Sequence, residues 1–280
     1  MRAIDVHVHL STPEVLERDS MRAQKETYFK TSLRAMTAAE MAEMYRRLEM
    51  KAVIFVIDKE AGSGDPFIGN DYVAKVASEH PDVFIGFASV DPWKGRTAVR
   101  ELERALTELG LRGLKLQPAT QAFYPNDRQF YSVYEVCAKH RVPVLIHTGH
   151  TGIGAGTPGG SGIRLRYTRP IPCIDDVAAD FPELTIIGAH PSWPWQEEML
   201  AVALHKANVY MDLSGWSPKY FAPSLIQYAN TLLQDKVMFG SDFPVLSPER
   251  WLKDFEGAPF KDEVRPKILL ENARRVLGLP

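Results

Sequence analysis

Short runs of apolar, often β-branched residues alternate with longer segments of mixed polarity along the whole 280-residue chain. A continuous apolar run of this length is typical of a parallel strand that is covered on both faces. One such run alone could belong to a buried helix, but eight in regular succession predict eight strands. The runs cover residues 3–10, 52–57, 83–90, 113–117, 142–147, 184–190, 208–213 and 236–241.

The segments between the runs carry apolar residues three and four positions apart, which is the pattern of amphipathic helices. One segment opens with Thr37 and Glu40, the two residues of a capping box. Further helices are expected around residues 102–109, 130–137 and 265–277. Eight strands that alternate with helices predict a single α/β domain over residues 1–280, a (β/α)8 or TIM barrel.

Two connections, residues 11–36 and 148–172, are longer than a barrel needs. Both follow the carboxyl ends of strands, where barrel enzymes have their active sites, so we expect them to be functional lids. The second contains Gly154-Ala-Gly-Thr-Pro-Gly159, which has the spacing of a dinucleotide-binding motif. That motif needs a strand, a tight turn and a helix in immediate succession. Pro158 and further loop residues interrupt that succession, so the segment predicts a glycine-rich lid.

The composition is that of an ordinary globular protein, with 45% apolar and 24% charged residues and a formal charge of −2. No long run of one charge predicts contact with nucleic acid or a membrane surface. The two cysteines, Cys137 and Cys173, have neither zinc-binding nor redox spacing. With no pattern of a secretory leader or a bilayer-spanning segment, these features predict a cytoplasmic protein with reduced thiols.

Histidines mark the ends of several predicted strands. His7 and His9 lie two residues apart on one strand, so both imidazoles face the same side and can hold one metal ion. Packing of two buried histidines is the alternative explanation. His147 and His190 end the fifth and sixth runs, and Asp242 follows the eighth. Neutral imidazoles and a carboxylate suit zinc, and also manganese, iron or nickel.

The chain resembles the amidohydrolase superfamily, specifically the branch of aminocarboxymuconate-semialdehyde decarboxylase, resorcylate decarboxylases and related hydrolases. The resemblance extends over essentially the whole chain. It is carried by DVHVH at 5–9, GLKL at 113–116, IHTG at 146–149, AHP at 189–191, GSDFP at 240–244 and ENA at 271–273.

This resemblance implies that His7, His9, His147 and Asp242 bind one divalent metal, with zinc expected first and manganese second. It also implies that His190 is the catalytic base or acid on a metal-activated water, which Asp242 contacts as well. In two-metal members of the superfamily a carboxylated lysine on strand four bridges the metals. The branch resembled here has one metal, so we expect Lys115 to be a barrel-interior or substrate-contacting residue.

Cationic residues are frequent in both long connections, and the arginine fork suits carboxylate or phosphate groups. Arg164 and Arg166 of the second connection are therefore candidate substrate-binding residues, together with Lys115 and Trp193. Trp193 is one of several aromatic residues after strands six to eight that could wall a pocket. Solvated surface charges and ordinary packing at the rim are the competing explanations.

These residues predict a metal-dependent hydrolase that acts on a small anionic aromatic, lactone or β-oxo acyl substrate. The alternative is a metal-dependent, non-oxidative decarboxylase of an aromatic or unsaturated carboxylic acid. The glycine-rich connection leaves room for a larger acyl substrate, which favours hydrolysis slightly. A binding protein with a decayed site would have lost ligand residues, and all five are present. The resemblance further implies a homodimer or homotetramer.

Overall fold

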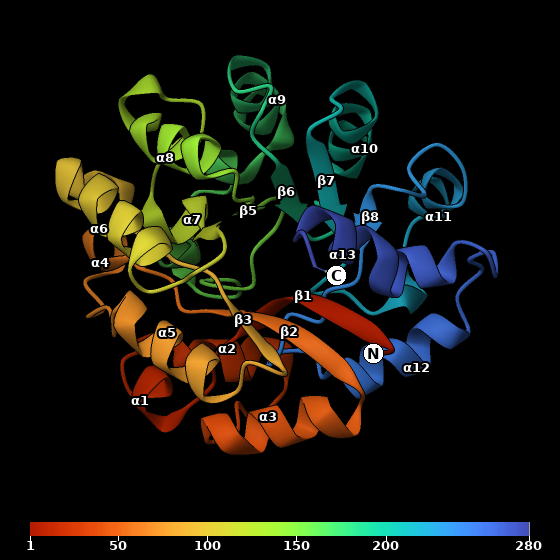
Figure 1. Ribbon diagram of the computed structural model, residues 1–280, viewed down its shortest axis with the longest axis horizontal. Coiled ribbons are helices and arrows are strands. Elements are labelled where there is room, and N and C mark those ends of the chain that lie inside the picture. Colours follow the sequence, from red (N-terminus) through yellow and green to blue (C-terminus); the bar gives the residue numbers. More distant parts are fainter. Residues whose placement is uncertain (280) are drawn as a thin grey trace.

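The computed structural model describes residues 1–279 and shows a closed barrel of parallel strands inside a ring of helices (Figure 1). The strands form two hydrogen-bonded groups, β1-β2-β3 and β4-β5-β6-β7-β8. A bridge between Ala88 and Leu114 and another between Val8 and Phe243 close the barrel. The strands are β1 (Ala3–His9), β2 (Met50–Phe55), β3 (Phe84–Gly86), β4 (Leu114–Leu116), β5 (Val144–His147), β6 (Ile186–Ala189), β7 (Val209–Asp212) and β8 (Val237–Met238).

The outer ring consists mainly of the helices that follow each strand. These are α3 (Ala38–Arg47), α5 (Asn70–Glu79), α6 (Arg96–Thr107), α8 (Ser132–His140), α9 (Pro170–Asp180), α10 (Gln196–His205), α11 (Pro223–Ala229), α12 (Pro248–Glu256) and α13 (Asn272–Val276). Short helices α1 (Pro13–Leu16), α2 (Arg22–Phe29), α4 (Glu60–Ser63) and α7 (Pro118–Gln121) lie in the connections. No helix within residues 1–279 is long and apolar enough to cross a membrane.

The predicted TIM barrel is confirmed, and every observed strand falls within or overlaps its predicted run. The capping box of Thr37 and Glu40 is also present at the start of α3. The eighth strand differs most, because regular pairing covers only Val237–Met238 of the predicted residues 236–241. Beyond it the chain still bonds to β1, since the Asp242 amide donates to the His7 carbonyl at 2.9 Å.

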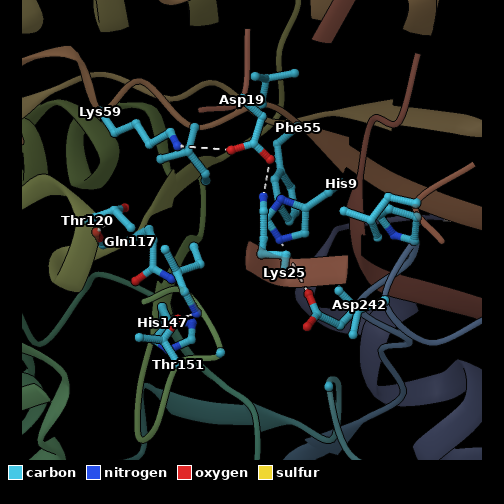
Figure 2. Close-up of a pocket in the computed structure, with 18 of the residues that line it drawn as sticks. His9, Asp19, Lys25, Phe55, Lys59, Gln117, Thr120, His147, Thr151 and Asp242 are labelled. Carbon is cyan, nitrogen blue, oxygen red and sulfur yellow. Dashed lines mark hydrogen bonds and ion pairs between the residues drawn. The ribbon is translucent and has the colours of Figure 1, made fainter. Parts of the chain in front are cut away.

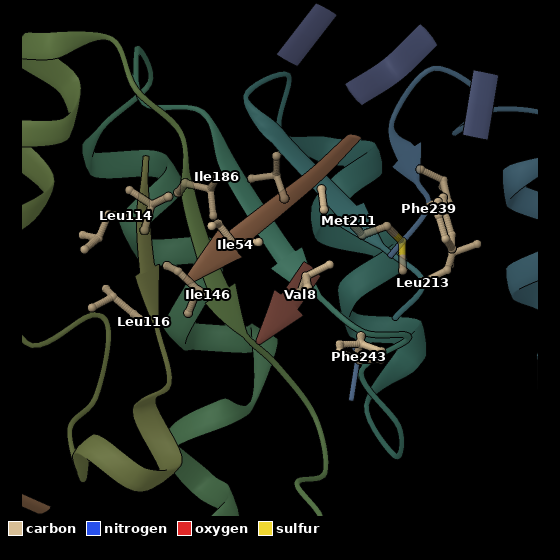
Figure 3. Close-up of a cluster of buried hydrophobic side chains, with 14 of the residues drawn as sticks. Val8, Ile54, Leu114, Leu116, Ile146, Ile186, Met211, Leu213, Phe239 and Phe243 are labelled. Carbon is tan, nitrogen blue, oxygen red and sulfur yellow. The ribbon is translucent and has the colours of Figure 1, made fainter. Parts of the chain in front are cut away.

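Residues of the strands are buried on both faces, which explains the continuous apolar runs. Alternate residues of one strand point to opposite sides. Val53 and Phe55 of β2 face the barrel interior, whereas Ile54 packs with the cluster between the strands and the helices. Figure 3 shows this outer cluster on neighbouring strands, including Ile146 and Ile186.

The two long connections contact each other through Gln24 of α2. Its amide Nε2 donates to the carbonyls of Gly152 and Ala155 at 3.0 and 2.7 Å, and its Oε1 accepts from the Gly154 amide at 3.0 Å. The Phe29 ring packs so closely on Gly152 that a Cβ atom there would lie 2.1 Å from it. These contacts hold the glycine-rich segment against the first connection.

Candidate metal centre

A cavity of about 530 Å³ opens at the carboxyl ends of the strands, beneath the two long connections. Its floor includes His9, His147, His190 and Asp242 from four different strand ends, and Phe55 contributes to an aromatic wall. Figure 2 shows His9 and Asp242 on one side of this cavity and His147 on another. The barrel therefore brings together residues that are separated by more than two hundred positions in the sequence.

Asp242 lies between the two histidines of the first strand. Its Oδ1 atom is 3.3 Å from the Nε2 atoms of both His7 and His9. One ligand-type atom from each of these three residues lies within 4.8 Å of the others. Burial opposes ionisation of Asp242, but the hydrogen bond from His9 is the main effect that outweighs it, and the pKa of Asp242 is lowered to about 2. The carboxylate is thus available as a metal ligand at neutral pH.

A buried carboxylate orients His7. Asp212 at the end of β7 accepts from the Nδ1 atom of His7 at 3.0 Å, which leaves the Nε2 lone pair of His7 facing Asp242. Asp212 also accepts from the backbone amides of His190 and Ser214, so its oxygens are already engaged. Burial and the nearby Lys115 cation lower the pKa of His7 to about 3. His7 is therefore neutral, as a metal ligand must be.

A series of hydrogen bonds determines which ring nitrogen of His147 carries the proton. The Nδ1 atom of His190 lies 3.0 Å from the carbonyl of Ser214, which can only accept, so this nitrogen carries the proton. The Nε2 atom of His190 then accepts from Nδ1 of His147 at 2.9 Å. The remaining nitrogen of His147, Nε2, is buried and has no hydrogen-bond partner. Burial lowers the pKa of His147, so this free lone pair belongs to a neutral ring.

These donors fit a divalent cation. His147 lines the same cavity as His9 and Asp242, its Nε2 atom is without a partner, and a buried polar atom is normally paired. Three neutral imidazoles and one carboxylate are a donor set that zinc and manganese accept. A second group of His7, His190 and Asp212 also lies within 4.8 Å, but its atoms bond to one another or to Ser214.

Lys115 lies inside the barrel on β4 and is 1% exposed. Its Nζ atom is 3.2 Å from Nε2 of His7 and 5.1 Å from the centre of the Phe55 ring. Burial lowers the pKa of Lys115 to about 8. Lys115 is thus a residue of the barrel interior that also lines the cavity.

The other substrate-binding candidates lie elsewhere. Arg164 and Arg166 are exposed and do not line the cavity; the Arg166 guanidinium lies over the rings of Tyr124 and Tyr167 at 5.6 and 5.3 Å. Trp193 is 53% exposed and packs beside His150, outside the cavity lining. These placements differ from the expected substrate contacts. Contacts with neighbouring aromatic rings hold Arg166 and Trp193 outside the cavity lining.

Sequence reasoning counted Lys25 among the cations of the first connection but missed the series of alternating charges to which it belongs in the cavity wall. Lys59 lies 2.7 Å from Oδ2 of Asp65 and 3.6 Å from Oδ1 of Asp19, and Asp19 also pairs with Lys25 (Figure 2). All four residues line the cavity. Sequence reasoning also missed three polar residues at or just after strand ends, namely Asp212, Ser214 and Gln117. The histidines were found because strand ends meet at the mouth of a barrel, and the same argument applies to these three residues.

The closed barrel with imidazoles and a carboxylate at its strand ends defines a TIM-barrel enzyme with a candidate metal centre. A family model described as amidohydrolase matches residues 4–279, so this chain belongs to the amidohydrolase family of enzymes. The relatives below agree with the branch of the superfamily that the motifs indicate.

Two curated relatives are decarboxylases. Over 78 residues the chain is 33% identical to 2-amino-3-carboxymuconate-6-semialdehyde decarboxylase of Dictyostelium discoideum; this alignment spans 28% of the chain and only 22% of that relative. Over 286 residues it is 22% identical to gamma-resorcylate decarboxylase of Polaromonas sp., covering 88% of this chain and 86% of the relative.

Solved structures show the same fold over the full length. An uncharacterized TIM-barrel protein of Bordetella bronchiseptica has a TM-score of 0.76 at 25% identity, with 99% of each chain covered. A dihydroxybenzoic acid decarboxylase of Polaromonas sp., solved with manganese and the inhibitor 2-nitroresorcinol, has a TM-score of 0.68 at 18% identity. That match covers 99% of this chain and 96% of the other.

Proposed function

We propose that this protein is a metal-dependent, non-oxidative decarboxylase of a small aromatic carboxylic acid. The observation that carries the proposal is the convergence of His7, His9 and Asp242 next to a cavity that His9 and Asp242 line together with His147, whose Nε2 atom has no partner. The sequence alone favours hydrolysis slightly. The relatives with a stated activity reverse this order, because both curated ones cleave a carbon–carbon bond.

The cavity suits one aromatic ring. A volume of about 530 Å³ lies within the range of small-molecule sites, and Phe29, Phe55 and Trp216 supply aromatic walls. The cations Lys25 and Lys59 are next to the space that a substrate carboxylate would enter. Three hydrogen bonds from Gln24 hold the glycine-rich connection over this cavity. A cavity covered in this way favours a small substrate over one with a long acyl chain.

His7, His9, His147 and Asp242 would hold the metal, and Lys115 stays a barrel-interior residue in a one-metal site. A bound divalent cation would act as a Lewis acid that polarises an oxygen of the substrate and favours electron density on the ring. Manganese accompanies the inhibitor in the Polaromonas decarboxylase structure, which supports manganese beside the zinc expected from the donor set.

Decarboxylation breaks the bond between the ring carbon and the carboxyl carbon, and the electron pair stays on the ring. Carbon dioxide leaves, and a proton must reach the same ring carbon. We assign its delivery to His190, which lines the cavity. While the Ser214 carbonyl holds Nδ1–H, the Nε2 atom would take a proton from solvent in place of its contact with His147 and pass it to the ring carbon. Asp242 stays ionised, because its low pKa keeps the proton off the carboxylate. In this scheme it holds the metal beside the substrate.

Release of carbon dioxide tests the proposal. Protein loaded with manganese, and separately with zinc, is offered hydroxylated benzoic acids, and gas release and the decarboxylated ring are measured together. We expect stoichiometric formation of both products. Absence of carbon dioxide from the whole panel, together with cleavage of a lactone or amide, would establish the hydrolase instead.

A further inference from the structure

We infer that Asp5 is a positioning residue whose buried carboxylate holds an irregularity in β1 that turns His7 and His9 toward the barrel interior. The same carboxylate joins β1 to the segment that carries Asp242. The inference rests on the metal centre of the proposed function, and it assigns a role to a buried acid that is not one of the proposed ligands.

Side chains of β1 change sides partway along the strand. Ile4 and Val6 pack in the interior cluster, whereas Val8 packs in the outer cluster between the strands and the helices (Figure 3). A regular strand would keep all three on one side, because its side chains alternate. The pairing of β1 with β2 shifts register between Asp5 and Val8, which is where the change of side occurs.

This change of side decides where the two histidines point. Asp5 lies on the outer side, where its carboxylate meets the hydroxyl of Tyr45 on α3. In a regular strand His7 and His9 would follow Asp5 to that side. Instead both rings lie against the interior residue Phe55, with ring centres 5.3 and 4.8 Å apart. The register shift therefore brings both proposed ligands of β1 to the interior.

The carboxylate of Asp5 holds the chain at this shift. Its Oδ1 atom accepts from the backbone amides of His7 at 3.2 Å and of Ser241 at 2.8 Å. Its Oδ2 atom accepts from the Tyr45 hydroxyl at 2.9 Å. Because Ser241 immediately precedes Asp242, one oxygen joins the two segments that supply three of the four proposed metal ligands.

Backbone bonds between β1 and the segment after β8 lie on either side of this joint. The Val6 amide donates to the Phe239 carbonyl at 3.0 Å. Further along, the Asp242 amide donates to the His7 carbonyl at 2.9 Å. Between these two bonds the Ser241 amide donates to the buried carboxylate, which takes the place of a backbone carbonyl where β1 is irregular.

A contribution to stability alone does not explain a carboxylate at this position. Asp5 is 0% exposed, and its three bonds come from two backbone amides and a hydroxyl, none of which is cationic. Removing a carboxylate from water is costly, and apolar side chains in place of buried charges are often as stable. The backbone shape that the carboxylate imposes on β1 accounts for its presence.

The manganese affinity of Asp5 variants tests this role. Asp5→Val removes both acceptor oxygens, whereas Asp5→Asn keeps one oxygen for the two backbone amides. Calorimetry on the folded proteins gives the dissociation constant of manganese. We expect it to rise by about 10–100-fold in Asp5→Val and by less than about threefold in Asp5→Asn, since residues that orient metal ligands affect affinity to this extent.

Asp91→Val is the matched control. Asp91 is also 0% exposed, and its carboxylate likewise accepts from two backbone amides, those of Ala61 and Trp93. It follows β3 and does not line the cavity. This variant should lose fold stability as Asp5→Val does, but it should bind manganese with the affinity of the wild type.

The position of His7 can also be measured without a metal. Its Nδ1 proton bonds to Asp212 and gives an NMR signal that is protected from exchange. We expect this signal in the wild type, Asp5→Asn and Asp91→Val, and its loss in Asp5→Val. If Asp5→Val does not fold, Tyr45→Phe replaces it and should raise the manganese dissociation constant at least about threefold. Wild-type affinity in Tyr45→Phe would then overturn the inference.

The outcomes separate this inference from the proposed function. A wild-type dissociation constant or an unchanged His7 signal in Asp5→Val overturns the inference, whether or not carbon dioxide is released. Equal weakening in Asp91→Val, or no retention of affinity in Asp5→Asn, overturns it as well. If the wild type binds no manganese, the proposed function is contradicted and the His7 signal decides the inference. Weakening confined to Asp5→Val without release of carbon dioxide supports the inference and contradicts the decarboxylase.

Discussion

The Nε2 atom of His190 lies 2.9 Å from the Nδ1 atom of His147, and both rings are buried. This contact, together with the Ser214 carbonyl behind His190, engages the Nδ1 atom of His147 and leaves its Nε2 lone pair without a partner, in a residue that lines the cavity. His190 can thus act in two ways, as a proton carrier to the substrate or as the group that orients a metal ligand.

Replacing His190 distinguishes these roles. In His190→Asn we expect turnover to fall by a factor of about 100 or more, while one equivalent of metal is retained. Metal content by elemental analysis and carbon dioxide release are measured on the same sample. If the variant instead loses its metal and regains full turnover in excess metal, His190 serves only to orient His147.

Metal binding should depend on His147. We expect His147→Ala to abolish metal retention and turnover, because it removes the only buried imidazole nitrogen within residues 1–279 that lacks a hydrogen-bond partner. The rise in melting temperature on adding manganese should disappear as well. His205→Ala, an exposed change at the end of α10, is the control and should bind metal normally. Normal metal content in His147→Ala would show that the site is misassigned.

The contact of Gln24 with the glycine-rich segment should control its local opening. Gln24→Ala removes three hydrogen bonds to Gly152, Gly154 and Ala155. We expect faster proteolytic cleavage within residues 149–163, because local opening there becomes less costly by about 1–3 kcal/mol. Gln129→Ala, which removes an exposed amide bonded only to Asp127, is the matched control. Equal cleavage rates in both variants would contradict this role of Gln24.

Asp254 on α12 should contribute stability that depends on pH. Burial opposes its ionisation, but Lys219, Arg250 and Ser217 outweigh it, so its pKa lies below the ordinary value. A lowered pKa in the folded state stabilises the fold above about pH 4, the unfolded value, and this stabilisation is lost as the pH falls further.

We therefore expect Asp254→Asn to lower the free energy of unfolding by about 1–2 kcal/mol at pH 7. The difference from the wild type should shrink steadily below pH 4. Chemical denaturation between pH 3 and pH 8 measures it. A difference that grows toward low pH would mean that folding raises the pKa of Asp254 instead of lowering it.

The sequence by itself determined the barrel and the strand-end histidines. Period-two spacing places His7 and His9 on one face, and continuous apolar runs report strands that are buried on both sides. These patterns involve residues close together in the sequence, so they can be recognised without knowledge of the fold. The carboxyl ends of parallel strands meet at one mouth, which is why His147 and Asp242 could be grouped with the pair.

Only the tertiary structure decided which polar groups are paired and which are left free. The bond from His7 to Asp212 joins residues 205 positions apart, and the orphaned Nε2 atom of His147 is defined by what does not reach it. Arg164 had suitable chemistry but lies at the surface. Whether a polar side chain is hydrogen-bonded or exposed depends on residues that are distant in the sequence and pack around it. Residue type and local spacing do not specify which residues these are.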